Sequence, residues 1–212
     1  MDFQDFLALV PKLIRVPLPA NEAHFKMAPL ERIHFLKNLN TETINPKVAA
    51  VMMLMYPKNG KTHLVLIVRN SYKGVHSAQI AFPGGKQELF DPNFETTALR
   101  ETQEEIGLPI DKMEVVMPFT SIYISPSNFM VYPFLGICRE EIEFVPDSKE
   151  VFEIIELPLT VFLNNDLQIH TEIDTSYAKT IVTPAYKIDN HIVWGATAMM
   201  LSELKEVLKK VF

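Results

Sequence analysis

Apolar residues recur along the first ten positions with the period of an α-helix. Phe3, Phe6, Leu7 and Val10 stand at positions i, i+3, i+4 and i+7, which places them on one face of a short amphipathic helix. Four prolines between positions 11 and 29 forbid a continuous helix over the following twenty residues, and a second short helix is expected over residues 30–36. The pattern predicts a helical N-terminal extension, residues 1–45, that packs on the core.

Beyond position 46 the apolar pattern changes to that of strands. Residues 48–56 and 63–68 are apolar runs separated by the turn-forming segment PKNGK, which predicts a hairpin of buried strands. The remaining predicted elements are strands over residues 114–117, 119–124, 130–138, 168–173 and 180–188, and helices over residues 94–106, 158–163 and 196–211. This mixture, without an internal repeat, indicates an α/β or α+β fold.

Composition and charge narrow the classes of function. The 212 residues are 48% hydrophobic and 22% charged, as in a globular protein with one sizeable core. A formal net charge of −6 leaves no general basic field for nucleic acid, so any phosphate chemistry must be local. No apolar run is long enough for a membrane helix, the first residues lack a basic signal region, and Cys138 stands alone. We expect a cytoplasmic protein that binds neither nucleic acid nor membranes.

The candidate chemistry lies between residues 82 and 108. A Gly84–Gly85 loop precedes a helix on which Glu101, Glu104 and Glu105 fall within a sector of about 100°. Crowded carboxylates call for a cation, and oxygen ligands suit hard ions such as Mg²⁺ or Mn²⁺, which also bind substrate phosphates. The alternative is a solvated acidic helix face with Arg100 as its counter-ion.

The whole segment, FPGGKQELFDPNFETTALRETQEEIGL, resembles the signature of the Nudix hydrolase superfamily. The residues that match its pattern are Gly85, Arg100, Glu101, Glu104, Glu105, Gly107 and Leu108. Two departures exist: Asp91, in a loop one residue longer, replaces the usual Glu, and Thr102 replaces an aliphatic residue. The first departure is similar to the coenzyme A pyrophosphatase branch. Thr102 lies on the apolar side of the helix, where its hydroxyl can bond back to a carbonyl.

This resemblance implies a Nudix fold over residues 46–212. That fold is α+β, an α/β/α sandwich with a mixed β-sheet between helices and the acidic helix lining a cleft. The implied ligands of Mg²⁺ or Mn²⁺ are three carboxylates and a loop carbonyl: Glu101, Glu104, Glu105 and Gly85 or Gly84. Arg100 would orient them, and Asp91 is expected to brace the loop rather than to bind metal.

The preceding run, LIVRNSYKGVHSAQIAFPGG, also resembles the coenzyme A branch, which carries an Arg, then a His or Asn, then a Gln before Phe-Pro-Gly-Gly. Asn70 and Ala78 depart from the residues usual there. The implied substrate-binding residues are Arg69, Lys73, His76, Gln79, Lys86, Gly84 and Gly85. For Lys73 and His76 an ordinary loop position is the alternative. The cations among these residues are expected to bind the phosphates of the substrate.

Two features downstream extend the resemblance. The sequence IVWGATA is similar to the Trp-Gly-x-Thr-Ala that opens the last helix of that branch, and Trp194 is expected in the core. Glu150 precedes the strand that leads to Leu157, a place where Nudix enzymes often supply one more carboxylate. Glu150 is therefore the candidate general base, with Glu153 or a motif glutamate next in line.

The implied activity is divalent-metal-dependent hydrolysis of a nucleoside diphosphate derivative. The favoured substrate is coenzyme A or acyl-coenzyme A, which would give 3′,5′-ADP and (acyl-)phosphopantetheine. The alternatives within the class are ADP-ribose, a dinucleotide or a damaged nucleotide. A non-catalytic ligand sensor with the same fold is a further alternative, against which the complete Arg-Glu-x-x-Glu-Glu stands. A homodimer is left open.

Overall fold

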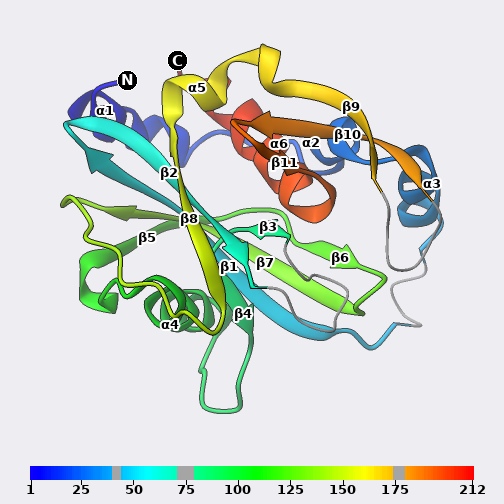
Figure 1. Cartoon of the computed structure of the whole chain (residues 1–212), viewed down its shortest axis with the longest axis horizontal. Coiled ribbons are helices and arrows are strands. Elements are labelled where there is room, and N and C mark those ends of the chain that lie inside the picture. The colour runs from blue at the N-terminus through cyan, green and yellow to red at the C-terminus, as the bar shows by residue number, and fades with distance from the viewer. Residues whose placement is uncertain (40–43, 71–78, 174–179) are drawn as a thin grey trace.

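The computed structural model describes residues 1–39, 44–70, 79–173 and 180–212. A large mixed sheet has helices on both sides, and a smaller antiparallel sheet lies beside the last helix (Figure 1). The large sheet comprises β1 (Lys47–Lys58), β2 (Lys61–Arg69), β3 (Ile80–Ala81), β4 (Gly84–Lys86), β5 (Met113–Pro118), β6 (Ile122–Ile124), β7 (Phe129–Cys138) and β8 (Val151–Pro158). The small sheet comprises β9 (Gln168–Ile173), β10 (Ile181–Ile188) and β11 (His191–Val193).

Six α-helices accompany these sheets in the described ranges. They are α1 (Phe3–Leu13), α2 (Asn21–His24), α3 (Leu30–Lys37), α4 (Phe94–Ile106), α5 (Leu159–Leu163) and α6 (Gly195–Lys209). Helix α4 lies on one side of the large sheet, and α6 with the N-terminal helices lies on the other (Figure 1). Within these ranges no helix is both long and apolar enough to cross a membrane.

Strand β1 organises the large sheet. It pairs antiparallel with β2 through a tight turn at Asn59 and Gly60, whose φ values of 50° and 69° suit the turn type that hairpins favour. It also pairs in parallel with β7, and its first half pairs antiparallel with β4, where Val51 lies opposite Gly84. The predicted hairpin is confirmed.

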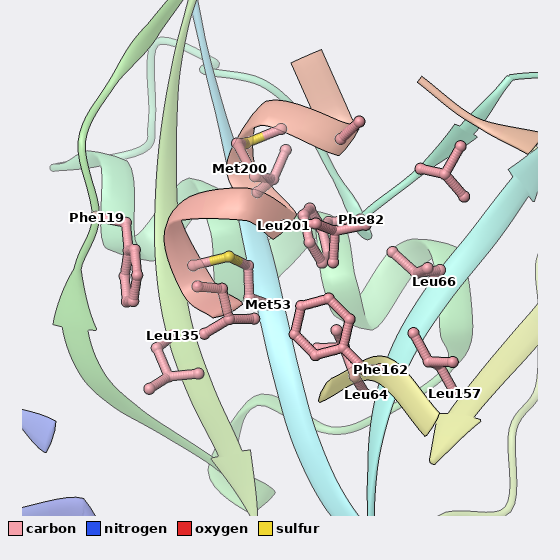
Figure 2. Close-up of a cluster of buried hydrophobic side chains, with 14 of the residues drawn as sticks. Met53, Leu64, Leu66, Phe82, Phe119, Leu135, Leu157, Phe162, Met200 and Leu201 are labelled. Carbon is pink, nitrogen blue, oxygen red and sulfur yellow. The ribbon is translucent and has the colours of Figure 1, made fainter. Parts of the chain in front are cut away.

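Both faces of β1 are buried, which explains its continuous apolar sequence. On one face, Met53 lies in a core cluster with Met200 and Leu201 of α6, and Figure 2 shows these side chains side by side. On the other face, Met52 belongs to a second cluster with Ala98 and Ile106 of α4. The layers are therefore helix, sheet and helix, as predicted.

The prolines leave no continuous helix over residues 11–29, as predicted, but Pro11 itself does not end the first helix. Helix α1 continues through Pro11 to Leu13. Pro11 is exposed and costs the helix one backbone hydrogen bond, whereas Leu13, Phe3 and Phe6 are fully or nearly fully buried. Burial of the apolar face outweighs the break in the ladder. The boundary of the extension at residue 45 stays a prediction.

The strand expected over residues 119–124 is shorter in the structure and begins at Ile122. Two interactions divert the chain before that point. The Phe119 amide donates to the carbonyl of Pro133, and the Thr120 amide and hydroxyl donate to the carboxylate of Glu203 at 3.1 and 2.6 Å. A side-chain acceptor from a distant helix thus replaces the sheet ladder at this position.

The same carboxylate fastens the N-terminal extension to α6. Glu203 is fully buried and also accepts from the Ala20 amide at 2.8 Å, and it lies 3.2 Å from Nε2 of buried His24. Burial alone would oppose ionisation of Glu203, but its bonds to His24 and Thr120 outweigh burial and hold its pKa below the ordinary value. One carboxylate therefore joins three segments of the chain.

Replacing Glu203 with Ala should lower the free energy of unfolding by about 3 kcal/mol, because several buried donors lose their acceptor at once. Chemical denaturation of both proteins at neutral pH measures the difference. Glu206→Ala is the matched control, since Glu206 lies on the same helix in a part-exposed ion pair with Lys26 and should matter by less than about 1 kcal/mol. Equal losses in the two variants would contradict the role assigned to Glu203.

Candidate active site

Helix α4 has the bounds that the sequence predicts. Asn93 caps its first turn by accepting from the Thr96 amide at 2.8 Å, and Gly107 ends it in the left-handed region at φ 75°. The hydroxyl of buried Thr102 donates to the carbonyl of Ala98 at 2.6 Å, as expected. The departure at Thr102 therefore leaves the helix and its acidic face intact.

Glu105 is buried against the first glycine of the loop. Its carboxylate accepts from the Gly84 amide at 2.7 Å and lies 3.4 Å from Nη1 of Arg69. A β-carbon at Gly84, whose φ is 149°, would collide with the backbone of Ala50 and Val51. Burial raises the pKa of Glu105 to about 8, although Arg69 and the Gly84 amide favour the charged form.

Glu101 lies against the second glycine. A β-carbon at Gly85 would collide with the Glu101 carboxylate, so only glycine allows the strand and this side chain to approach so closely. Burial raises the pKa of Glu101 above its ordinary value, and the nearby charge of Glu104 adds to the rise, whereas Arg100 opposes it. The two glycines thus place a strand backbone beside two carboxylates of α4.

Arg100 connects the loop to the acidic face. Its guanidinium lies 2.9 Å from Asp91, 2.8 Å from Glu101 and 2.8 Å from Glu104, and it donates to the carbonyl of Lys86 at 3.1 Å. An arginine fork that holds several oxygens at once fixes their relative positions.

Asp91 braces the loop, as predicted. Besides Arg100, its carboxylate accepts from the Glu88 amide and the Thr97 hydroxyl, each at 3.0 Å. The hydrogen bond from Arg100 is the main reason that the pKa of Asp91 falls to about 2. Asp91 therefore remains charged at all ordinary pH values and holds the loop to the start of α4.

Glu150 lies near the carboxylates of α4 although it is far from them in sequence. It immediately precedes β8, whose Val151 pairs with Arg69 of β2, and its charge contributes to the raised pKa values of Glu101 and Glu105. Glu153 is placed differently, 3.4 Å from Nε2 of His191. Of the two carboxylates considered for the base, the structure brings Glu150 to the acidic face.

A cavity of about 350 Å³ opens beside the glycine loop on the α6 side of the sheet. Gly84, Gly85 and Lys86 form one part of its lining, together with Arg69 and Gln79. The carboxylates of α4 do not line it, but they contact the same two glycines from the other side. Lys73 and His76 lie outside the described residues.

The lining of the cavity also contains residues that the sequence did not identify as site residues. Trp194 is half-buried and lines the cavity, so the prediction that it belongs to the core is wrong. It stands before α6, where Thr197 donates to the carbonyl of Ile80 and the first turn meets the cavity. Arg32 of α3 also lines the cavity. Nothing in the pattern of the extension marks Arg32, because only the fold brings α3 to this place.

The acidic face offers donors that suit a divalent cation in type. All are carboxylate or carbonyl oxygens, which hard ions prefer. In the part of the chain that the structure describes, no three acidic, His or Cys side chains form a ready metal-binding group. Glu101 and Glu104 both contact Arg100. The cradle at Gly85 and the raised carboxyl pKa values fit a cation that would share these oxygens with Arg100.

Comparisons with known proteins point in one direction. A family model described as the NUDIX domain matches residues 46–177. Nudix hydrolase 22, chloroplastic, from Arabidopsis thaliana is 30% identical over 178 residues, 81% of this chain and 59% of that protein. The uncharacterized Nudix hydrolase NudL of Citrobacter koseri is 30% identical over 180 residues, 82% of this chain and 90% of that protein. Peroxisomal coenzyme A diphosphatase NUDT7 of Mus musculus is 31% identical over 127 residues, 60% of this chain and 53% of that protein.

Solved structures share the architecture at low sequence identity. RenU, a Nudix hydrolase from M. smegmatis, has a TM-score of 0.53 at 16% identity and covers 79% of this chain and 88% of its own. A MutT/nudix family protein from Enterococcus faecalis has a TM-score of 0.52 at 16% identity and covers 92% of this chain and 76% of its own. Similarity at this level concerns the fold. This chain spans 90% of the length of the Citrobacter protein, but less than two thirds of the length of the Arabidopsis and mouse proteins.

Replacing Asp91 with Asn should lower the free energy of unfolding by about 1 to 3 kcal/mol at neutral pH, because the charged bonds to Arg100 are lost. The folded pKa lies below the unfolded one, so the carboxylate stabilises the fold above the ordinary carboxyl range and loses this effect as the pH falls toward 2. The difference between the two proteins should therefore shrink in urea titrations from pH 6 to pH 3.

The control for this prediction is Glu88→Gln in the same loop. Glu88 forms only an exposed contact of 3.6 Å with Lys86, so its replacement should change stability by less than about 1 kcal/mol. A difference between wild type and Asp91→Asn that does not vary with pH would show that Asp91 titrates normally in the fold.

Proposed function

Since this chain belongs to the Nudix family, whose model matches residues 46–177, and is a hydrolase of that family, we propose that its substrate is coenzyme A or an acyl derivative. The Nudix fold expected from the sequence is confirmed by the solved structures that share it. Nudix hydrolases act on small nucleoside diphosphate derivatives. The proposed reaction cleaves the diphosphate bond and yields 3′,5′-ADP and (acyl-)phosphopantetheine.

The lining of the cavity carries this proposal. Its charged side chains among the described residues are all cations, Arg32, Arg69 and Lys86, although the chain as a whole has a net charge of −6. Most of the rest is apolar or aromatic, with Phe82 and Trp194 among the lining residues. Coenzyme A combines several phosphates with a long, partly apolar arm, so it suits a cavity with both properties. The name of the mouse relative, a coenzyme A diphosphatase, supports the same choice.

The residues of the acidic face have separate roles in this proposal. Nudix hydrolases generally use divalent metals, and Glu101, Glu104 and Glu105 with the carbonyl of Gly85 would hold Mg²⁺ or Mn²⁺. The bound cation would neutralise charge on the diphosphate oxygens and lower the pKa of water. Arg100 orients Glu101 and Glu104, and the Gly84 amide fixes Glu105. Arg69, Gln79 and Lys86 would bind the substrate along the loop, and Lys73 and His76 are proposed as further substrate-binding residues.

The chemical step needs a base that takes a proton from the attacking water. Water then attacks one phosphorus atom, and the other phosphate leaves with the bonding electron pair. Glu150 is proposed for this role because it approaches the acidic face from β8 and its charge acts on Glu101 and Glu105. A cytoplasmic location and a homodimer stay predictions.

Other readings of the site lead to different outcomes. The same carboxylates would also act on the diphosphate or triphosphate of the alternative substrates, which are ADP-ribose, a dinucleotide and a damaged nucleotide. These substrates do not combine the several phosphates with the long, partly apolar arm of coenzyme A. A sensor without turnover would need the cavity but not the full set of Arg100, Glu101, Glu104 and Glu105. The interlocked geometry of this set favours an enzyme over a sensor.

Incubation of the purified protein with Mg²⁺ or Mn²⁺ and a panel of diphosphates tests the proposal. Mass spectrometry should detect 3′,5′-ADP and phosphopantetheine from coenzyme A, with a larger kcat/KM than for ADP-ribose or dinucleotides. Faster turnover of ADP-ribose than of coenzyme A would assign the enzyme to the alternative substrate class. Tight binding of a nucleotide without any product would support a sensor.

Replacing Glu150 with Gln should lower kcat by a factor on the order of 10² or more with little change in KM, because a general base acts mainly in the transition state. Steady-state kinetics under saturating metal measures both parameters. Glu153→Gln is the matched control on the following strand, where the carboxylate lies beside His191 and not beside α4. If Glu153→Gln lowers kcat and Glu150→Gln does not, the base is Glu153.

A further inference from the structure

The cavity is built from three separate parts of the chain. The NUDIX match, residues 46–177, contributes the glycine loop, Arg69 and the strands that form the floor. Arg32 comes from the extension before that match, and Trp194, Thr197 and Met200 come from the segment after it. The lining of the cavity therefore depends in part on residues outside the family match.

The order of the strands sets the distance between the two ends of this cavity. At this edge of the sheet, Lys86 of β4 lies opposite Ala49 of β1, Ala49 pairs with Val131 of β7, and Val131 pairs with Ile122 of β6. Three strand spacings separate β4 from β6, a distance of about 14 Å. The Arg32 guanidinium is held at the β6 end, where Nη2 donates to the carbonyl of Tyr123 at 2.9 Å.

The surroundings of Arg32 in the cavity are suited to an anion. The lining residues near this end include Ile124, Pro126 and Phe129, and no acidic side chain of the described chain lines the cavity anywhere. A guanidinium beside apolar walls binds phosphate oxygens with its planar fork more strongly than one in bulk water. Helix α3 is fixed there because Ile33 and Leu36 pack against the main core.

The other two cations of the cavity lie near the glycine loop. Arg69 lies 3.4 Å from the buried carboxylate of Glu105, and Lys86 lies 3.6 Å from Glu88. Both are at the end where the diphosphate would be cleaved. In coenzyme A the 3′-phosphate is carried by the same ribose as the 5′-diphosphate, so it would lie one sugar away from the cleaved group, on the side of the cavity toward Arg32.

We propose that Arg32 of the N-terminal extension is a specificity-determining residue that binds a phosphate of the substrate other than the diphosphate that is cleaved. In the substrate of the proposed function, on which this identification rests, that group is the 3′-phosphate of coenzyme A. The extension then selects the substrate, while the family match supplies the reaction.

Binding of two nucleotides that are not cleaved tests this role without turnover. Calorimetry with adenosine 3′,5′-bisphosphate and adenosine 5′-monophosphate compares ligands that differ only in the 3′-phosphate. The wild type should bind the bisphosphate more tightly by about ten- to a hundredfold, the effect of a charge-assisted contact. Arg32→Ala should remove most of this preference and leave the affinity for the monophosphate within about threefold.

Two further variants separate ligand binding from a structural role. Arg32→Gln retains a donor for the Tyr123 carbonyl without the charge and should also lose the preference. Lys37→Ala removes an exposed cation of the same helix, whose Nζ lies over the Phe25 ring, and should keep it. The proposal is overturned if the wild type does not distinguish the two nucleotides, or if the Arg32 variants weaken both equally. Failure of coenzyme A hydrolysis with the preference intact would overturn the proposed substrate alone.

Discussion

The structure depends on the close approach of the Gly84–Gly85 backbone to the carboxylates of α4. The Gly84 amide donates to Glu105, and a β-carbon at Gly85 would occupy the space of the Glu101 carboxylate. A β-carbon at Gly84 would instead collide with the backbone of Ala50 and Val51 in β1. Arg100 and Asp91 preserve the approach, because their ion pair joins the loop after β4 to the helix that follows it. Backbone and carboxylate oxygens are thereby held together at one edge of the sheet, next to the cavity.

The two sides of the large sheet carry different parts of the proposed site. Helix α4 brings the carboxylates from one side, and the cavity lies on the other side under α6 and α3. Glu203 of α6 accepts a hydrogen bond from the Ala20 amide and pairs with His24. These two contacts hold the N-terminal segment against α6. The position of the proposed specificity residue therefore depends on a buried interaction remote from the chemistry. In the proposed account, substrate selection by Arg32 is separate from the carboxylates of α4.

Sequence patterns predicted the elements whose residues interact locally. Helix α4 has the predicted bounds because its cap at Asn93 and its end at Gly107 are encoded within the helix, and the hairpin of β1 and β2 is encoded by its Asn-Gly turn. Sequence patterns failed where contacts with residues distant in sequence determine the local structure. Burial of Leu13 carries α1 past Pro11, and Trp194 reads as a core residue although it lines a cavity. The family resemblance, rather than periodicity, pointed to Glu150, whose proximity to α4 arises from the pairing of β8 with β2. Arg32 lacks a local signal of any kind.

The central claim, that the glycine pair and the α4 carboxylates form one metal-dependent centre, is tested most directly by Gly85→Ala. The added methyl group meets the far end of the flexible Glu101 side chain, so the fold can be retained while that carboxylate is displaced. Calorimetric titration with Mn²⁺, together with the melting temperature, measures both properties on the same protein. The account predicts at least about tenfold weaker Mn²⁺ binding, the scale of losing one well-placed ligand interaction, at a melting temperature within a few degrees of the wild type. Unchanged Mn²⁺ affinity in a folded Gly85→Ala variant would contradict it.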